Sequence, residues 1–224
     1  IREHWKDQDN FAYLFNSILY DLSVNFGKTY VLYMLCKNFT SKAEETPCIW
    51  FFQDRELLAK AIVDYLPLES DLGVIASDKA YIKKYLRARD ISIDKVSFEK
   101  RPFTLAMVQT IDARKGKELD KKFFDYFYIG VFDECHKASN TRANRVLDSF
   151  NFGLLAGASG SPLGSLSGSD RFDVLGSFGS IQHKVTFDDT VQIGRSLPLE
   201  VWSLHNPILV KEPTSNYNVG RVKK

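Results

Sequence analysis

The sequence contains little that would indicate a disulfide-rich, zinc-binding or membrane protein. Only three of its 224 residues are cysteine. They are widely spaced and form no CxxC pair, so neither a disulfide framework nor a zinc site is favoured. No apolar run approaches the roughly 20 residues that cross a bilayer, and the first residues do not resemble a signal peptide. We therefore expect no membrane partner and a reducing, cytoplasmic location.

The sequence also lacks a surplus of charge of either sign. Thirty Lys and Arg against 28 Asp and Glu leave a net charge of +2, so overall charge does not indicate a nucleic-acid binder. Any such binding must use a local surface. A hydrophobic content of 44% is enough for a full core at this length. Because the chain starts without Met and ends in a stretch with little periodicity, we expect it to be part of a longer protein.

Strands and helices are predicted to alternate along most of the chain. Short apolar runs predict buried strands at residues 48–52, 72–76, 104–108, 126–132 and 154–158. Apolar residues at helical spacing predict helices at residues 9–18, 29–39, 55–66, 78–89 and 141–150. This alternation indicates an α/β fold, in which a mostly parallel sheet is covered by helices on both faces as a three-layer sandwich.

The last third of the chain has a different composition. Residues 159–170 are rich in Gly, Ser and Leu, which is typical of a loop, and residues 199–204 are predicted to form a final strand. We expect residues 1–205 to form one domain and residues 206–224 to be a linker toward a second domain.

The first motif that carries chemistry is Gly27-Lys28-Thr29, which begins a predicted helix directly after a turn. The backbone N–H groups and the dipole at a helix start attract anions, so this segment, with Asn25 and Phe26 before it, is a candidate phosphate-binding loop. Lys28 would reach the β and γ phosphates of ATP, and the Thr29 hydroxyl would ligate Mg²⁺. The full GxxxxGK[ST] pattern requires Gly at position 22, where this chain has Leu, so an ordinary helix start remains an alternative.

A second motif, Asp133-Glu134-Cys135-His136, follows the most strand-like segment of the chain. Both carboxylates are expected at the carboxyl edge of the sheet, where the phosphate-binding loop also lies. Asp133 could hold Mg²⁺ through water, and Glu134 could orient and deprotonate the water that attacks the γ phosphate. A lone Asp-Glu pair could simply end a strand, but its combination with Gly-Lys-Thr favours a hydrolytic centre.

Together these motifs resemble the first RecA-like domain of the superfamily 2 DExH-box helicases and translocases, closest to the branch-migrating and restriction-type DNA enzymes of phages and bacteria. The resemblance covers roughly residues 2–205. It implies an ATP hydrolase that uses Mg²⁺, and a second RecA-like domain that supplies an arginine. It also implies a nucleic-acid partner, with DNA favoured over RNA.

The resemblance assigns roles to further residues. The Ser159-Gly160-Ser161 segment lies where the family couples hydrolysis to movement, and we expect His136 to hydrogen-bond near the γ phosphate or to Ser159. Gln8 lies at about the place of the adenine-reading glutamine.

Two further segments resemble the family elements that lie along the nucleic-acid backbone. They contain Asp54 and Arg55 in the first segment, and Gln109 and Thr110 in the second.

Two other functions remain possible from the sequence. Another P-loop NTPase, such as a packaging motor or a nucleotide kinase, would share Gly-Lys-Thr but would not need the Ser159 segment after a DExH motif. A degenerate helicase domain could persist as a binding module, and Leu22 is the feature in its favour.

Overall fold

The computed structural model describes residues 16–23, 26–40, 46–69, 71–164 and 166–197. Within them, eight strands form one sheet in the order β4-β3-β5-β2-β6-β7-β1-β8, and every pairing is parallel. The strands are β1 (Ser17–Leu22), β2 (Cys48–Phe52), β3 (Leu72–Ile75), β4 (Val96–Ser97), β5 (Phe103–Met107), β6 (Ile129–Asp133), β7 (Leu154–Ser159) and β8 (Ile181–Val185). The predicted α/β fold with a parallel sheet is confirmed.

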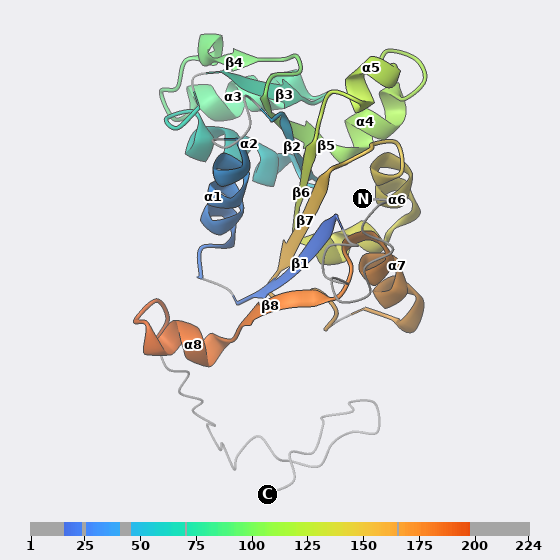
Figure 1. Cartoon of the computed structure of the whole chain (residues 1–224). Helices are drawn as coiled ribbons and strands as arrows, with labels where there is room; N and C mark the ends of the chain where they lie inside the picture. The colour runs from blue at the N-terminus through green and yellow to red at the C-terminus, as the bar shows by residue number, and fades with distance from the viewer. Residues whose placement is uncertain (1–15, 24–25, 41–45, 70, 165, 198–224) are drawn as a thin grey trace, which may run out of the picture.

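Helices cover both faces of the sheet (Figure 1). One face carries α1 (Lys28–Thr40), α2 (Arg55–Tyr65) and α3 (Lys79–Arg87). The other carries α4 (Val108–Arg114), α5 (Lys121–Phe124), α6 (Thr141–Leu147) and α7 (Gly168–Phe178). Two short 3-10 helices, η3 (Ile93–Lys95) and η4 (Cys135–Ser139), and the helix α8 (Phe187–Gln192) complete the described elements.

The central strand β2 shows why continuous apolar runs mark the strands of this sheet. All five of its residues are buried, with Trp50 on the α1–α3 face and Ile49 and Phe51 on the α4–α7 face. Side chains of successive strand residues point to opposite faces, and here both faces are covered. Each apolar side chain of β2 therefore enters one of the two cores.

The predicted helix at residues 9–18 is wrong where the structure can test it. Residues 9–15 lie outside the described part of the chain, and Ser17 begins the strand β1, which pairs with β7 and β8. Leu19 enters the α4–α7 core and Leu22 the α1–α3 core, at 0% and 1% exposure. The helical spacing of the apolar residues misled the prediction because it cannot report pairing with distant strands.

The predicted loop at residues 159–170 is too long at its carboxyl end. Helix α7 begins at Gly168, with Ser167 as its N-cap, and β8 and α8 follow without having been predicted. Short capping patterns mark the starts of α7 and α8. The Ser167 hydroxyl accepts from Asp170 N, and Thr186 forms a capping box with Asp189. Both are Ser/Thr-x-x-Asp patterns that the sequence analysis did not use.

Other predictions agree with the structure to within a few residues. The strand predicted at residues 126–132 begins later, at Ile129, and the helix predicted at residues 141–150 ends at Leu147. The predicted strand at 199–204 and linker at 206–224 lie outside the described residues. All three cysteines are buried and free. In the described part of the chain, no helix combines the length and apolar character needed to span a membrane.

Candidate active site

The start of α1 has the backbone geometry of a phosphate-binding loop. Gly27 has φ of +91°, a conformation that glycine adopts without strain, and nothing lies within 4 Å of the place where a Cβ would be. The chain then enters α1 at Lys28, and Val31 N donates to Gly27 O at 3.0 Å. The N–H groups of the first turn of a 13-residue helix have no intrahelical acceptors, so they are available to an anion.

Position 22 explains how the loop accommodates its departure from the glycine pattern. Leu22 is the last residue of β1, and its side chain is buried in the core beneath α1. A leucine there adds apolar packing under α1. The loop therefore leaves the carboxyl end of a buried parallel strand and enters a helix, as phosphate binding requires. Leu22 therefore has a packing role at this position.

The two acidic residues arise at the carboxyl end of β6, beside β7. Asp133 pairs with Ala158 in the sheet, and Glu134 turns the chain into η4 with left-handed backbone angles, φ 55° and ψ 50°. Such angles are uncommon for a residue other than glycine and concentrate at functional sites. The turn directs the Glu134 carboxylate back toward the start of α1.

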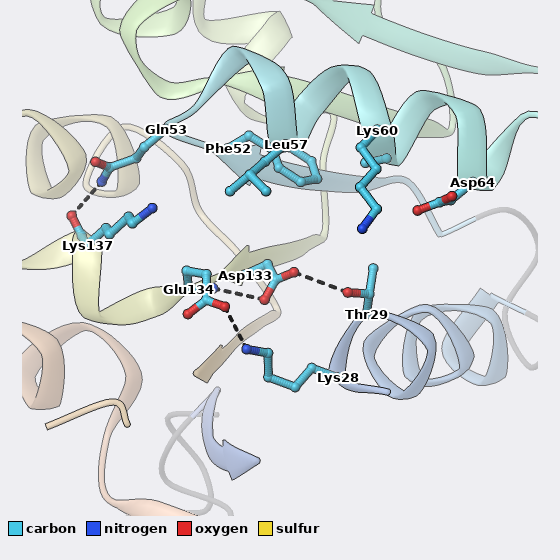
Figure 2. A pocket seen from close by; sticks show the side chains of 11 residues that line it. Lys28, Thr29, Phe52, Gln53, Leu57, Lys60, Asp64, Asp133, Glu134 and Lys137 are labelled. Carbon is cyan, nitrogen blue, oxygen red and sulfur yellow. Dashed lines mark hydrogen bonds and ion pairs between the residues drawn. The ribbon is translucent and has the colours of Figure 1, made fainter. Parts of the chain in front are cut away.

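The structure brings the two motifs into direct contact. Lys28 Nζ donates to Glu134 Oε1 at 2.6 Å, and Thr29 Oγ1 donates to Asp133 Oδ2 at 3.3 Å (Figure 2). The partners are more than 100 residues apart in the sequence, so only the parallel sheet places them together. The predicted meeting of the phosphate-binding loop and the acidic pair at one edge of the sheet is confirmed.

The ionisation of the three polar residues after β6 differs with their surroundings. Burial raises the pKa of Asp133 above its ordinary value of 3.8, although Lys28 acts in the opposite direction. Burial would also raise the pKa of Glu134, but the hydrogen bond and charge of Lys28 outweigh burial and lower it. Burial lowers the pKa of His136 below 6.5, so its ring is neutral at pH 7.

These residues fit Mg²⁺ and a nucleotide phosphate. A hydroxyl and a carboxylate oxygen 3.3 Å apart, on Thr29 and Asp133, are the hard oxygen ligands that Mg²⁺ prefers. Lys28 supplies a compact positive charge for phosphate oxygens. A cavity of about 210 Å³ opens above these side chains, lined also by the end of β2 and one side of α2.

Ser159 is the centre of a hydrogen-bonded group behind Glu134. His136 Nδ1 lies 2.9 Å from Ser159 Oγ, so the predicted contact between them is present. The Ser159 hydroxyl also donates to Glu134 Oε2 at 3.3 Å and accepts from Ser161 N at 3.3 Å. Ser159 is only 1% exposed, whereas Ser161 is exposed. With Gly160 between them, these residues connect the hydrolytic carboxylate to the surface beyond β7.

The first segment that is predicted to contact nucleic acid follows strand β2. The Asp54 carboxylate caps α2 by accepting from Glu56 N at 2.7 Å. Arg55 forms an ion pair with Asp78 and lies over the Tyr81 ring. Both side chains are exposed at the edge of the sheet, and their contact with nucleic acid remains a prediction.

The second segment follows β5, which is adjacent to β2 in the sheet. Thr110 is 4% exposed, and its hydroxyl accepts from Ser77 N at 3.0 Å, which gives it a structural role. Gln109 Nε2 donates to Gln53 O at 2.7 Å. Gln53 also bonds Lys137 O, and its Oε1 accepts from Asn140. Gln53 thus joins the start of α4, η4 and the N-cap of α6 at this edge, a role that the sequence analysis missed.

Some predicted and some unpredicted residues complete the site. Gln8 and Asn25 lie outside the described residues, and Phe26 packs against the α1–α3 core. The cavity is lined in addition by Lys60 of α2 and Lys137 of η4, neither of which was predicted. The sequence position of Lys60 does not indicate this location, because α2 reaches the cavity through the pairing of β2 with β6. Lys137 directly follows the predicted Asp133–His136 motif, and this nearness is the signal that could have identified it.

The fold and the site together define a P-loop ATP-binding domain of the RecA-like helicase class. The sequence matches the family described as "Type III restriction enzyme, res subunit" over residues 9–162. This match covers more than half of the chain, and the chain belongs to that family. It is the first RecA-like domain of a superfamily 2 helicase-type protein. No curated protein matches the sequence.

The chain is also similar to solved structures at low sequence identity. The helicase domain of Hef from Pyrococcus furiosus is 16% identical, with a TM-score of 0.54 over 77% of this chain and 36% of that chain. The Sulfolobus solfataricus SWI2/SNF2 ATPase core, solved in complex with dsDNA, is 14% identical, with a TM-score of 0.50 over 75% and 34%. The UvsW helicase from bacteriophage T4 is 19% identical, with a TM-score of 0.48 over 75% and 54%. This chain thus spans about a third of the length of the first two.

Proposed function

We propose that this chain binds Mg²⁺–ATP through Lys28, Thr29, Asp133 and Glu134, and that it is the ATP-binding half of a nucleic-acid helicase or translocase. The observation that supports this most strongly is the pair of contacts Lys28–Glu134 and Thr29–Asp133, made by segments far apart in the sequence. Family membership favours this function over that of a packaging motor or a nucleotide kinase.

The residues have separate roles in the proposed chemistry. Thr29 and Asp133 would hold Mg²⁺, which neutralises charge on the phosphates when bound. Lys28 would exchange its bond to Glu134 for phosphate oxygens. Glu134 would then be free to accept a proton from the attacking water, because the Lys28 bond that lowers its pKa would be gone.

The proposed partners are a nucleic acid, with DNA favoured over RNA, and a second RecA-like domain. The linked loops at Gln53 and Gln109 lie at the same edge of the sheet as the ATP site, so a strand bound there would share elements with the nucleotide. One protein with this fold was solved with dsDNA. The coupling role of Ser159 is supported by its bonds to both Glu134 and Ser161.

The test is a pair of substitutions at the two motifs. Lys28→Ala should lower ATP affinity by about tenfold or more, because a charge-assisted phosphate contact is lost. Glu134→Gln should keep Mg²⁺–ATP binding but lower nucleic-acid-stimulated hydrolysis by the full-length protein about 10²-fold or more. Lys84→Ala, on the exposed side of α3, is the matched control. Unchanged ATP binding by Lys28→Ala would overturn the site assignment.

A further inference from the structure

The cavity beside the acidic pair is surrounded by more positive charge than the nucleotide motifs supply. Lys60 lies midway along α2, and Lys137 lies in η4, three residues after Glu134. Figure 2 shows both side chains extending into the cavity from different sides. Among the described residues, neither lysine ammonium forms an ion pair, whereas Lys28 is already bonded to Glu134.

Packing does not explain the direction of these two lysines. Both are exposed residues, and a solvated lysine usually extends its charge away from other cations. Here the two ammonium groups converge on the cavity that Lys28 also lines. Three carboxylates also line the cavity: Asp133 and Glu134 on its floor, and Asp64 on α2. A divalent cation on Thr29 and Asp133 would offset two of these negative charges, so that the three lysines outweigh the one that remains.

We propose that Lys60 and Lys137 hold the inorganic phosphate that ATP hydrolysis releases, and that it leaves past α2. This inference rests on the proposed ATP hydrolysis. In that reaction the water oxygen bonds to the γ phosphorus, and the bond from phosphorus to the bridging oxygen breaks with its electron pair going to ADP. The water proton passes to Glu134 and then to solvent. Hydrogen phosphate, a dianion, is left beside Glu134, on the side where Lys60 and Lys137 lie.

The other residues that line the cavity are suited to brief binding of a small anion. Phe52 and Leu57 form an apolar wall on one side of the cavity and offer no charge that competes with the lysines for an anion. Asp64 lies on α2 one turn after Lys60 and opposes a long residence time. A weak and transient phosphate site is therefore expected.

Both lysines belong to elements next to the edge of the sheet that is predicted to bind nucleic acid. Helix α2 begins at Arg55, and the Lys137 carbonyl accepts from the Gln53 side chain. Phosphate bound by Lys60 and Lys137 would therefore hold α2 and η4 together near Gln53. Release of phosphate would remove this link between α2 and η4 next to the nucleic acid. The cavity would thereby couple ATP hydrolysis to nucleic-acid binding.

The experiment measures binding, so it does not depend on turnover. The chain is first titrated with ADP in the presence of Mg²⁺, and the ADP-loaded protein is then titrated with inorganic phosphate. Lys60→Met and Lys137→Met remove the charge but keep most of the side-chain length. Lys83→Met, on the exposed side of α3, is the control. Each cavity variant should weaken phosphate binding about two- to fivefold, the range of an exposed ion pair, and leave ADP affinity unchanged.

The outcomes separate this inference from the proposed function. If the parent chain does not bind ADP with Mg²⁺, the nucleotide site itself is wrong, and the phosphate site fails with it. If ADP binds but phosphate affinity is the same in parent, Lys60→Met and Lys137→Met, only the phosphate site is overturned. An equal loss of ADP and phosphate affinity would also overturn it, because the lysines would then serve the nucleotide.

Discussion

At the scale of single residues, the site combines two carboxylates whose surroundings move their pKa values in opposite directions. Asp133 is largely buried, and desolvation dominates, so its pKa rises. Glu134 is more open and bonds directly to Lys28, so its pKa falls. Divergent pKa values in neighbouring acids are a common property of catalytic centres. In the proposed mechanism both shifts would be reversed when the ligands bind, because Mg²⁺ would lower the pKa of Asp133 and loss of the Lys28 bond would raise that of Glu134.

The raised pKa of Asp133 predicts that this residue lowers the stability of the protein without ligand. An acid whose pKa is higher in the folded state stabilises the fold only below its ordinary value of 3.8, and that contribution is lost as pH rises through the folded-state pKa. Asp133→Asn should therefore have a higher free energy of unfolding than the parent at pH 7. Denaturant unfolding without Mg²⁺ measures the difference, which should vanish near pH 3. A less stable variant at pH 7 would contradict this account.

At the scale of secondary-structure elements, α7 is held against the sheet by an aromatic side chain over a glycine. Phe178 of α7 is fully buried, and a Cβ at Gly157 of β7 would lie 2.7 Å from its ring. Gly157→Ala should lower the free energy of unfolding by about 1–3 kcal/mol, the usual cost of overpacking. Gly168→Ala, in the first turn of α7 with nothing within 4 Å, is the matched control and should be neutral or slightly stabilising. Equal denaturant midpoints for Gly157→Ala and parent would refute the packing.

The segment after β7 is predicted to couple hydrolysis to movement. Ser159 contacts both His136 and Glu134, and its neighbour Ser161 faces outward. In the full-length protein, the double substitution Ser159→Ala and Ser161→Ala should leave most ATPase activity while strand remodelling is lost. Parallel assays of ATP hydrolysis and strand displacement make the comparison. An equal loss of both activities would point to a catalytic or folding role instead.

The same segment predicts that the coupling of ATP hydrolysis to strand displacement depends on pH. The pKa of His136 is lowered by burial, so its neutral form prevails above pH 6.5. Because the Ser159 hydroxyl donates to Glu134, His136 Nδ1 donates to Ser159, and protonation keeps this bond but adds a positive charge 3.4 Å from Glu134 Oε2. Coupling should therefore be constant at neutral pH and decline only as pH falls through the lowered pKa. Strand displacement per ATP hydrolysed, measured from pH 8 to pH 5, tests this, and a decline that starts near pH 7 would contradict it.

At the scale of the whole molecule, the proposed mechanism divides the ATP site between this chain and a second domain. We expect this chain alone to fold and bind ATP weakly, but to hydrolyse it very slowly, because an arginine from a second domain contributes about 10³ to 10⁵ in rate in related NTPases. Adding the second domain should restore turnover and make it depend on nucleic acid. Steady-state ATPase assays on both forms provide the comparison. Robust nucleic-acid-stimulated hydrolysis by this chain as a monomer would refute the two-domain mechanism.

Local signals in the sequence predict most of the architecture and of the candidate active site. Buried strands such as β2 are recognisable because both faces of a parallel sheet are covered, so every residue must be apolar. The motifs at Lys28 and Asp133 are recognisable because phosphate binding needs a helix start and Mg²⁺ needs a carboxylate at a strand end. Each of these signals is local, and a few consecutive residues carry it.

Features that depend on contacts between distant segments could not be predicted from the sequence. Ser17–Leu22 is a strand because β7 and β8 lie on either side of it, although the helix predicted at residues 9–18 extended into its first two residues. Lys60 reaches the ATP site because β2 pairs with β6, which places α2 above Asp133. The physical reason is the same in both cases. Backbone hydrogen bonds between strands and charges across a cavity join residues whose separation in the sequence has no fixed period.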